Sequence, residues 1–108
     1  MRAVRSTGAG VEVVDVASPE QSEGAGEVIS IRSAGICGSD FDYIRLGSRF
    51  VLGHELAGVT EDGRLVAVEA VFGCGRCDQC GAGMYNRCRA VGERVPGLTM
   101  DGGMAERF

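Results

Sequence analysis

Several features are missing or scarce in this 108-residue sequence, and each absence narrows the possible functions. No apolar run approaches the ~18 residues that cross a membrane, and Met1-Arg2 leads into no hydrophobic signal region. We therefore expect a cytoplasmic protein with no membrane partner. The 11 Lys and Arg residues are outnumbered by 15 Asp and Glu, for a net charge of −4. This shortage of positive charge argues against nucleic acid as a partner.

A fingerprint for dinucleotide binding is also missing. No G-x-G-x-x-G follows a predicted strand, because Gly8-Ala9-Gly10 and Gly24-Ala25-Gly26 lack the third glycine and a following helix. The length suits one domain of roughly 100–200 residues, without room for a dinucleotide-binding domain beside a catalytic one. We expect residues 1–108 to form one domain, with a nicotinamide-binding domain absent.

Proline is scarce, with two residues, whereas glycine is abundant, with 18. An interior glycine costs a helix about 1 kcal/mol, so this composition disfavours a helical bundle and favours short strands with tight turns. Alternating or β-branched apolar residues predict four strands, over residues 11–16, 27–33, 50–59 and 65–72. The sequence predicts a mainly β fold, either a small β-barrel or a sandwich, with long loops.

The segments between these strands carry turn and helix signals. Asp62-Gly63 predicts a hairpin between the last two strands, and residues 18–26 predict a surface loop. Residues 39–46 predict a short helix with Ser39 as its N-cap. Gly53 and Gly58 indicate close backbone approach within the third strand. The fourth strand is expected to be buried on both faces apart from Glu69, and Phe41, Tyr43 and Ile44 are expected to pack in the core.

Four of the five cysteines follow the spacing C-x2-C-x2-C-x7-C within the segment CGRCDQCGAGMYNRC, namely Cys74, Cys77, Cys80 and Cys88. Four thiolates converging on one point are typical of a closed, structural zinc site. Disulfides fit poorly without a signal for an oxidising compartment. An iron–sulfur cluster fits poorly because Arg89, not proline, follows the last cysteine. The pattern predicts a zinc-binding lobe over residues 73–89.

The fifth cysteine, Cys37, lies in GICGSD, and the single histidine, His54, lies in LGHEL. Taken separately, these residues are explained equally well as a small core cysteine and a structural histidine. Taken together, each flanked by glycine and followed by an acidic residue, they are compatible with an open metal site. Such a catalytic zinc site keeps three protein ligands and one exchangeable position.

The ordered set GICGSD, GHE, the four-cysteine segment and GGMAE resembles the zinc-dependent medium-chain alcohol and polyol dehydrogenases. The resemblance covers the N-terminal, GroES-like catalytic domain of that family, from Met1 to Phe108. It implies a small GroES-like β-barrel with a zinc lobe, a second zinc for catalysis, and an alcohol or sugar substrate. It also implies NAD or NADP bound by a domain outside this chain, and a homo-oligomeric parent enzyme.

By position, Cys37 and His54 resemble two ligands of the catalytic zinc. Glu55 resembles the acid beside the metal, and Ser39 resembles the hydroxyl that receives the substrate's proton. Asp40 resembles the carboxylate that orients the ligand histidine. These roles agree with general chemistry, because a carboxylate on the other imidazole nitrogen fixes the tautomer, and zinc acts as a Lewis acid.

The resemblance has departures. Asp42 stands where several family members carry a relay histidine, and the interval from Cys37 to His54 is short for the family. The family's third catalytic zinc ligand lies beyond Phe108. We therefore expect residues 1–108 by themselves to be inactive in hydride transfer.

Three other functions remain open from the sequence. A non-enzymatic zinc ribbon would explain the four-cysteine segment but not GICGSD and GHE. A GroES-like interaction module would have the fold without the chemistry. A cysteine hydrolase would use Cys37 and His54, but no oxyanion hole is marked. Zinc stoichiometry separates these alternatives from the dehydrogenase domain.

Overall fold

Two antiparallel sheets form the body of the protein in a computed structural model that describes residues 1–20 and 26–108. The first sheet pairs β1 (Arg2–Ser6) with β2 (Val11–Asp15), and the second has the order β3 (Ile29–Gly35), β4 (Glu55–Thr60), β5 (Leu65–Val68). The helical elements are α1 (Asp40–Arg45), α2 (Asp78–Gly81), η1 (Tyr85–Arg87) and η2 (Val91–Glu93). The expectation of a mainly β fold is confirmed.

The predicted strands are present with shifted boundaries. Residues 11–16 correspond to β2, and residues 27–33 correspond to β3, which starts and ends two residues later than predicted. The third strand begins at Glu55 instead of residue 50, because residues 51–53 turn away to contact β1 and the C-terminal segment. Of the loop predicted for residues 18–26, residues 21–25 lie outside the described residues.

Strand β1 has no counterpart among the predicted strands, because RAVRS has no clear apolar alternation. Its structure comes from its partners. All five residues pair with β2, and Gly8-Ala9-Gly10 forms the connecting turn, in which Thr7 N–H donates to Gly10 O at 3.0 Å. Gly8-Ala9-Gly10, the first of the two segments compared with a dinucleotide-binding fingerprint, is therefore a hairpin turn.

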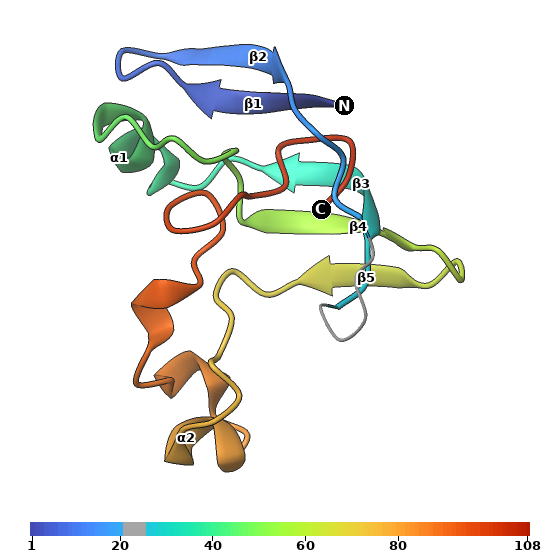
Figure 1. The fold of residues 1–108 in the computed structure, drawn as a ribbon, viewed down its shortest axis with the longest axis vertical. Helices are drawn as coiled ribbons and strands as arrows, with labels where there is room; N and C mark the ends of the chain where they lie inside the picture. The colour runs from blue at the N-terminus through green and yellow to red at the C-terminus, as the bar shows by residue number, and fades with distance from the viewer. Residues whose placement is uncertain (21–25) are drawn as a thin grey trace.

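The C-terminal segment joins the two sheets. Ala105 bridges to Ala3 on β1, and Arg107 bridges to Ser30 on β3. The same segment runs beside residues 51–53, where Gly102 N–H donates to Val51 O at 2.7 Å. A Cβ on Gly102 would lie 2.2 Å from Gly53 O, so this close approach requires glycine. The red segment passing between the sheets in Figure 1 shows this connection.

The core lies where β1, β4 and residues 51–52 meet. Ala3, Val51, Leu52 and Leu56 are buried. The prediction that residues 65–72 are buried on both faces is wrong: β5 ends at Val68, and Leu65 is 84% exposed. β5 lies at the edge of the β3–β4–β5 sheet, with alternate residues facing solvent. Phe41 is 59% exposed and Tyr43 and Ile44 are half-buried, so core packing is also wrong for Phe41.

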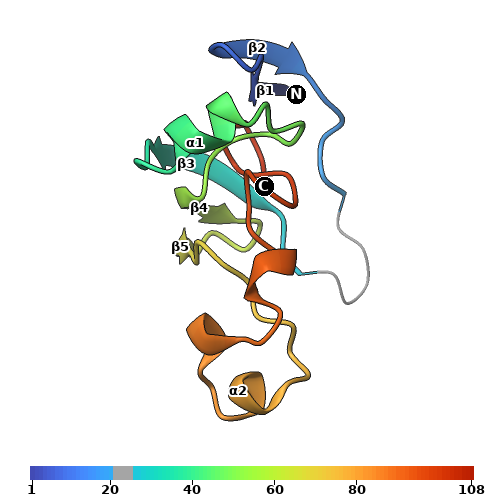
Figure 2. The same cartoon turned by 90° about the vertical axis from the view of Figure 1, so that its left-hand side faces the viewer.

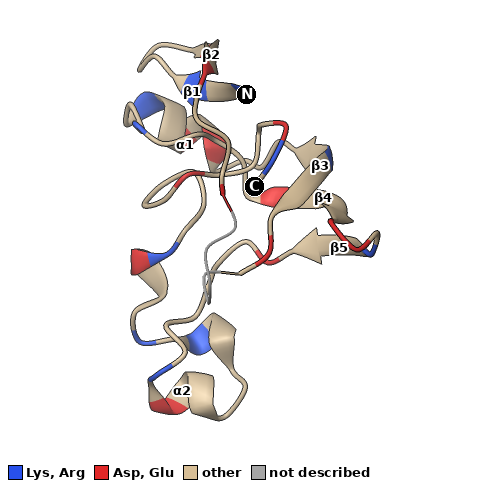
Figure 3. Cartoon of the chain, turned by 45° about the vertical axis from the view of Figure 1, so that its right-hand side comes forward, with Lys and Arg blue, Asp and Glu red and all other residues tan. Residues whose placement is uncertain are grey.

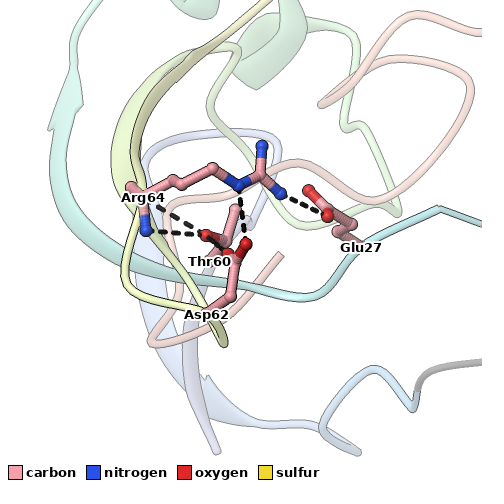
Figure 4. A network of polar contacts seen from close by, with 4 residues as sticks. All are labelled: Glu27, Thr60, Asp62 and Arg64. Atoms are coloured by element: carbon pink, nitrogen blue, oxygen red, sulfur yellow. Dashed lines mark hydrogen bonds and ion pairs between the residues drawn. The ribbon is translucent and has the colours of Figure 1, made fainter.

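The predicted hairpin at Asp62-Gly63 is confirmed. Gly63 has a φ of +88°, and Thr60 N–H donates to Arg64 O at 3.0 Å across the turn between β4 and β5. Figure 4 shows the Arg64 guanidinium between the carboxylates of Asp62 and Glu27, with the Thr60 hydroxyl donating to Asp62. This network attaches the turn to the segment that enters β3.

The segment with the four clustered cysteines projects away from both sheets. Figures 1 and 2 show α2 and the neighbouring helical turns below the body, connected to it by two extended stretches of chain. Acidic and basic residues occur both in this lobe and in the body (Figure 3). Among the described residues, none of the helices has the length and apolar character needed to traverse a bilayer.

Candidate metal centres

Cys37, His54 and Glu55 come together at one end of the β3–β4 pair. Cys37 lies just after β3, His54 just before β4, and Glu55 is the first residue of β4. Their potential ligand atoms all lie within 4.8 Å of one another. Gly35 is the cross-strand partner of Glu55, and a Cβ there would lie 2.7 Å from Glu55 Oε2. The glycine therefore leaves room for the carboxylate to lie beside the strand end.

The start of α1 supplies two polar side chains to the His54 imidazole. Ser39 Oγ lies 3.2 Å from His54 Nε2, and Asp40 Oδ1 lies 3.5 Å from His54 Nδ1. Asp40 Oδ2 also accepts a hydrogen bond of 2.8 Å from the Cys37 N–H. One buried carboxylate thus connects the backbone of Cys37 to the imidazole of His54. The structure brings together all five residues that the sequence selected around this site.

Ser39 does not act as a helix cap through its side chain. The helix begins one residue later, as expected for an N-cap residue, but the Ser39 hydroxyl makes no capping hydrogen bond. Its φ and ψ of −70° and −20° are already helical, whereas a capping residue usually has extended angles. Ser39 therefore has the predicted N-cap position, but its hydroxyl faces His54 instead of the helix.

The buried polar atoms of this cluster fit a metal ion. Asp40 and His54 are 2% and 6% exposed, and neither Asp40 Oδ1 nor His54 Nδ1 has a hydrogen-bond partner within the described chain at its present distance. A small approach of the two side chains would let Nδ1–H donate to Oδ1. The lone pair of Nε2 would then be free to bind a metal ion. Thiolate, imidazole and carboxylate are the donors that zinc accepts.

The second cluster contains the four lobe cysteines, whose sulfur atoms also lie within 4.8 Å of one another. Tetrahedral zinc–thiolate bonds of about 2.3 Å place sulfur atoms about 3.8 Å apart, close to the 4.0 Å between Cys77 and Cys88. The Cys88 sulfur also accepts from the N–H groups of Cys74 at 3.2 Å and Ala90 at 3.3 Å. This four-cysteine cluster fits a structural zinc site.

The lobe thiols have different affinities for protons. Backbone N–H groups of Arg89 and Cys80 lower the pKa of Cys77 to about 6, because they stabilise its thiolate. Backbone N–H groups of Arg76 and Cys77 lower the pKa of Cys74 in the same way. Burial raises the pKa of Cys80 to about 11, since a thiolate there loses hydration. Metal binding must therefore release a proton from Cys80 against that desolvation.

An ion pair that sequence reasoning did not select joins the start of α2 to the C-terminal end of the lobe. Arg89 donates two hydrogen bonds to Asp78, of 2.6 and 2.7 Å. Arg89 follows Cys88, and Asp78 is the first residue of α2, so the contact closes the cysteine segment on itself. The Arg89 guanidinium lowers the pKa of Asp78 to about 2. The cysteine spacing carries no signal for this pair.

Two more residues of α1 complete the description of the site. Asp42, where the resemblance would have placed a relay histidine, is exposed and pairs with Arg45. Tyr43 lies against His54, with ring centroids 5.6 Å apart. Sequence reasoning missed this contact; its one available signal was that Tyr43 follows Ser39 by four residues, one helical turn.

Residues 24–108 match the sequence model of the alcohol dehydrogenase GroES-like domain. Probable D-xylulose reductase A of Aspergillus terreus is 36% identical over 96 residues, which cover 72% of this chain and 27% of that protein. Galactitol-1-phosphate dehydrogenase from Escherichia coli superposes with a TM-score of 0.83 at 30% identity, covering all of this chain and 35% of its own.

A cobalt- and zinc-bound thermostable alcohol dehydrogenase from Pyrobaculum aerophilum superposes with a TM-score of 0.82 at 28% identity. The match covers all of this chain and 38% of that protein. These superpositions confirm the GroES-like fold predicted from the sequence. The chain spans about a quarter of the xylulose reductase and just over a third of the solved dehydrogenases.

Proposed function

The chain belongs to the family of the alcohol dehydrogenase GroES-like domain, and we propose that it is the zinc-binding catalytic domain of an NAD- or NADP-dependent oxidoreductase. Its substrate class is a small alcohol, polyol or sugar. The relatives support this class, since their names include a xylulose reductase and a galactitol-1-phosphate dehydrogenase. The nicotinamide cofactor is assigned to a part of the enzyme outside these 108 residues.

One observation carries the proposal: two separate metal-compatible clusters occur in one small domain. A structural metal needs only the four-cysteine lobe. The Cys37–His54–Glu55 cluster is built differently, with mixed donors, half-burial of Cys37 and exposure of Glu55. Mixed ligands at an accessible position are typical of a catalytic zinc, which keeps a coordination position for substrate.

In this proposal Cys37 and His54 hold the catalytic zinc, and Glu55 is the third protein ligand available within the chain. When bound, zinc supplies Lewis-acid polarisation of the substrate oxygen. Asp40 Oδ1 lies 3.5 Å from His54 Nδ1, and a small approach would let it accept from Nδ1–H and hold the imidazole in the tautomer with a free Nε2. Its other oxygen, which accepts from Cys37 N–H at 2.8 Å, fixes the backbone of the cysteine ligand.

Ser39 is the residue to which we assign proton transfer. Oxidation of an alcohol removes a proton from its oxygen, and the acceptor must be a hydroxyl or base within hydrogen-bond reach. Ser39 Oγ lies beside His54 Nε2 and is free of any capping bond. It receives the substrate's proton on Oγ as its own hydroxyl proton passes outward. Position 42 holds an aspartate instead of a relay histidine, and its carboxylate is paired with Arg45. The outward route of the proton therefore has no imidazole at this position.

The lobe cysteines hold the second zinc and keep the lobe folded. The lobe connects to the body through two chain stretches (Figure 2) and contains only short helical elements. Helices of three or four residues are unstable on their own, so a metal crosslink supplies the ordering that a hydrophobic core would otherwise supply.

Zinc stoichiometry and site-specific variants test the proposal on the chain as it stands. We expect two zinc ions per chain, falling to one in Cys37→Ala and in Cys80→Ser. A single ion that Cys37→Ala leaves in place would indicate a zinc ribbon instead. Rapid alkylation of the Cys37 thiol, together with the absence of metal at that site, would favour a cysteine hydrolase. The cytoplasmic location and the homo-oligomeric state of the parent stay predictions.

A further inference from the structure

The Tyr43 ring packs against the imidazole of His54 at an inclined angle. Their centroids are 5.6 Å apart, and the ring planes meet at 54°. Aromatic pairs attract in tilted arrangements at separations of 4.5–7 Å. Neither the alternating strand pattern nor the zinc-ligand spacing requires an aromatic residue here, and the proposed proton and metal chemistry does not use Tyr43.

Tyr43 is itself held in place by hydrogen bonds of its backbone. Its N–H donates to Ser39 O at 3.0 Å, and its carbonyl accepts from Ser48 N–H at 3.0 Å. Gly97 also lies beside the ring, since a Cβ there would sit 3.6 Å from Tyr43 Cδ2. Gly97 is buried, so the Tyr43 ring borders a closed backbone turn as well as the imidazole.

The imidazole needs such a support. The terminal torsion of histidine is broad and roughly two-fold, so the side chain's own rotamer preference leaves the ring plane free to swing. Ser39 Oγ lies within hydrogen-bond distance of Nε2, at 3.2 Å, but Asp40 Oδ1 is 3.5 Å from Nδ1 and makes no hydrogen bond there. One hydrogen bond leaves rotation about that contact possible, and the contact with the Tyr43 ring limits it.

We propose that Tyr43 is a positioning residue that fixes the imidazole plane of His54 and so preorganises the Cys37–His54–Glu55 centre for its metal. This inference rests on the proposed metal centre. It predicts that the aromatic ring of Tyr43 matters and that its hydroxyl does not. Removing the ring enlarges the orientational freedom that His54 must lose on metal binding, which weakens binding at this centre and leaves the four-cysteine lobe unaffected.

The test compares Tyr43→Phe, which keeps the ring, with Tyr43→Leu, which removes it. One equivalent of zinc first fills the lobe, and cobalt(II) is then titrated while its visible absorption is recorded. We expect the unmodified chain and Tyr43→Phe to bind cobalt equally, and Tyr43→Leu to bind about three- to tenfold more weakly. Zinc retention by the lobe in each variant controls for folding.

A measurement without metal keeps the inference testable if Tyr43→Leu folds poorly. His54 is the single histidine, so its ring signals in NMR spectra are unambiguous. We expect ring-current-shifted His54 protons with nuclear Overhauser effects to the Tyr43 ring in the unmodified chain. The Tyr43→Phe variant should show the same effects to the protons of its phenyl ring.

Three outcomes overturn the inference. Cobalt affinity in a folded Tyr43→Leu equal to that of the unmodified chain overturns the positioning role alone. The absence of any contact between the two rings in the unmodified chain does the same. Failure of the unmodified chain to bind cobalt once the lobe is filled overturns the metal centre, and the positioning role with it.

Discussion

Ser39 Oγ lies 3.2 Å from His54 Nε2, although Ser39 occupies the position where a serine hydroxyl ordinarily caps its own helix. The Tyr43 and Asp42 N–H groups at the start of α1 bond to the Ser39 carbonyl instead. The hydroxyl makes no bond to the helix and is available to the candidate site, so function and stability can be separated at this residue.

Ser39→Ala should leave stability nearly unchanged and impair catalysis. Loss of a true N-cap would lower the free energy of unfolding by about 1 kcal/mol or more, whereas we expect less than that here. Alcohol oxidation by the enzyme that contains this domain should fall about 10²–10⁴-fold, the usual contribution of a positioned proton acceptor. Denaturant unfolding and steady-state kinetics check the two effects, with Ser39→Thr as the hydroxyl-retaining control. A large destabilisation with unchanged turnover would contradict the assignment.

Cys80→Ser should release the lobe zinc. Cys80 is buried within the cluster and supplies one of its four sulfur donors. Because structural zinc contributes on the order of 10 kcal/mol to folding of its site, residues 72–91 should lose protection in hydrogen–deuterium exchange, while β3 and β4 keep theirs. Cys37→Ser is the matched control, which should leave the lobe protected. Full zinc retention in Cys80→Ser would refute this prediction.

The two metals should leave the protein at different rates. The Cys37–His54–Glu55 centre has three donors, one of them exposed, whereas the lobe offers four thiolates. Dialysis against a weak chelator should therefore remove the ion of the three-donor centre first, and Glu55→Gln should hasten that loss. Metal analysis of the retained protein measures it. Equal resistance of both centres to the chelator would count against the assignment.

The turn between β4 and β5 should weaken in acid. Hydrogen bonds from Thr60 and Arg64 lower the pKa of Asp62 below its ordinary value of 3.8. A lowered pKa means that the carboxylate stabilises the folded state above pH 3.8, and that this contribution is lost as the pH falls through and below that value. Asp62→Asn should thus destabilise the protein near pH 6, and the destabilisation should be smaller near pH 3.

Denaturant unfolding at the two pH values gives the comparison, and the difference between variant and unmodified chain removes effects of zinc loss common to both. Glu61→Gln, the adjacent exposed carboxylate, serves as the control. A difference for Asp62→Asn that does not shrink in acid would exclude the network of Figure 4 as its cause.

Gly102→Ala should disrupt the connection between the sheets. The new Cβ would lie 2.2 Å from the backbone oxygen of Gly53, which cannot move as a side chain could. We expect a loss of about 1–3 kcal/mol in the free energy of unfolding, the usual cost of overpacking. Gly92→Ala, with no atom within 4 Å of the added Cβ, should be nearly neutral. Similar melting temperatures for both variants would show that the C-terminal connection is adaptable.

The clustering of the four lobe cysteines could be predicted from the sequence. Cys74, Cys77, Cys80 and Cys88 lie within 15 residues of one another, so local glycine-rich turns are enough to bring their sulfurs together. Short-range spacing determines such a site almost regardless of the remaining fold. The hairpin at Asp62-Gly63 was predictable for the same reason, because a turn depends on the backbone angles of a few adjacent residues.

The tertiary structure decided how distant residues meet. Strand β1 exists because β2 and the C-terminal segment pair with it, contacts of long range that leave no periodicity in RAVRS. The boundary of β4 moved to Glu55 because residues 51–53 bond to β1 and to Gly102 and Met104 instead of to β3. The strand propensity of a segment cannot determine which of these partners it pairs with, since each partner offers the same backbone hydrogen bonds.

The candidate site likewise depends partly on features visible in the sequence and partly on tertiary packing. Glycine-flanked Cys37 and His54 marked it in the sequence by residue type, and the resemblance to dehydrogenases added the roles of Ser39, Asp40 and Glu55. That Ser39 turns its hydroxyl to His54 instead of to the helix, and that the Tyr43 ring packs on the imidazole, depended on where β4 sets His54 relative to α1. Side-chain direction across a long chain separation is set by packing, and only the folded structure contains that information.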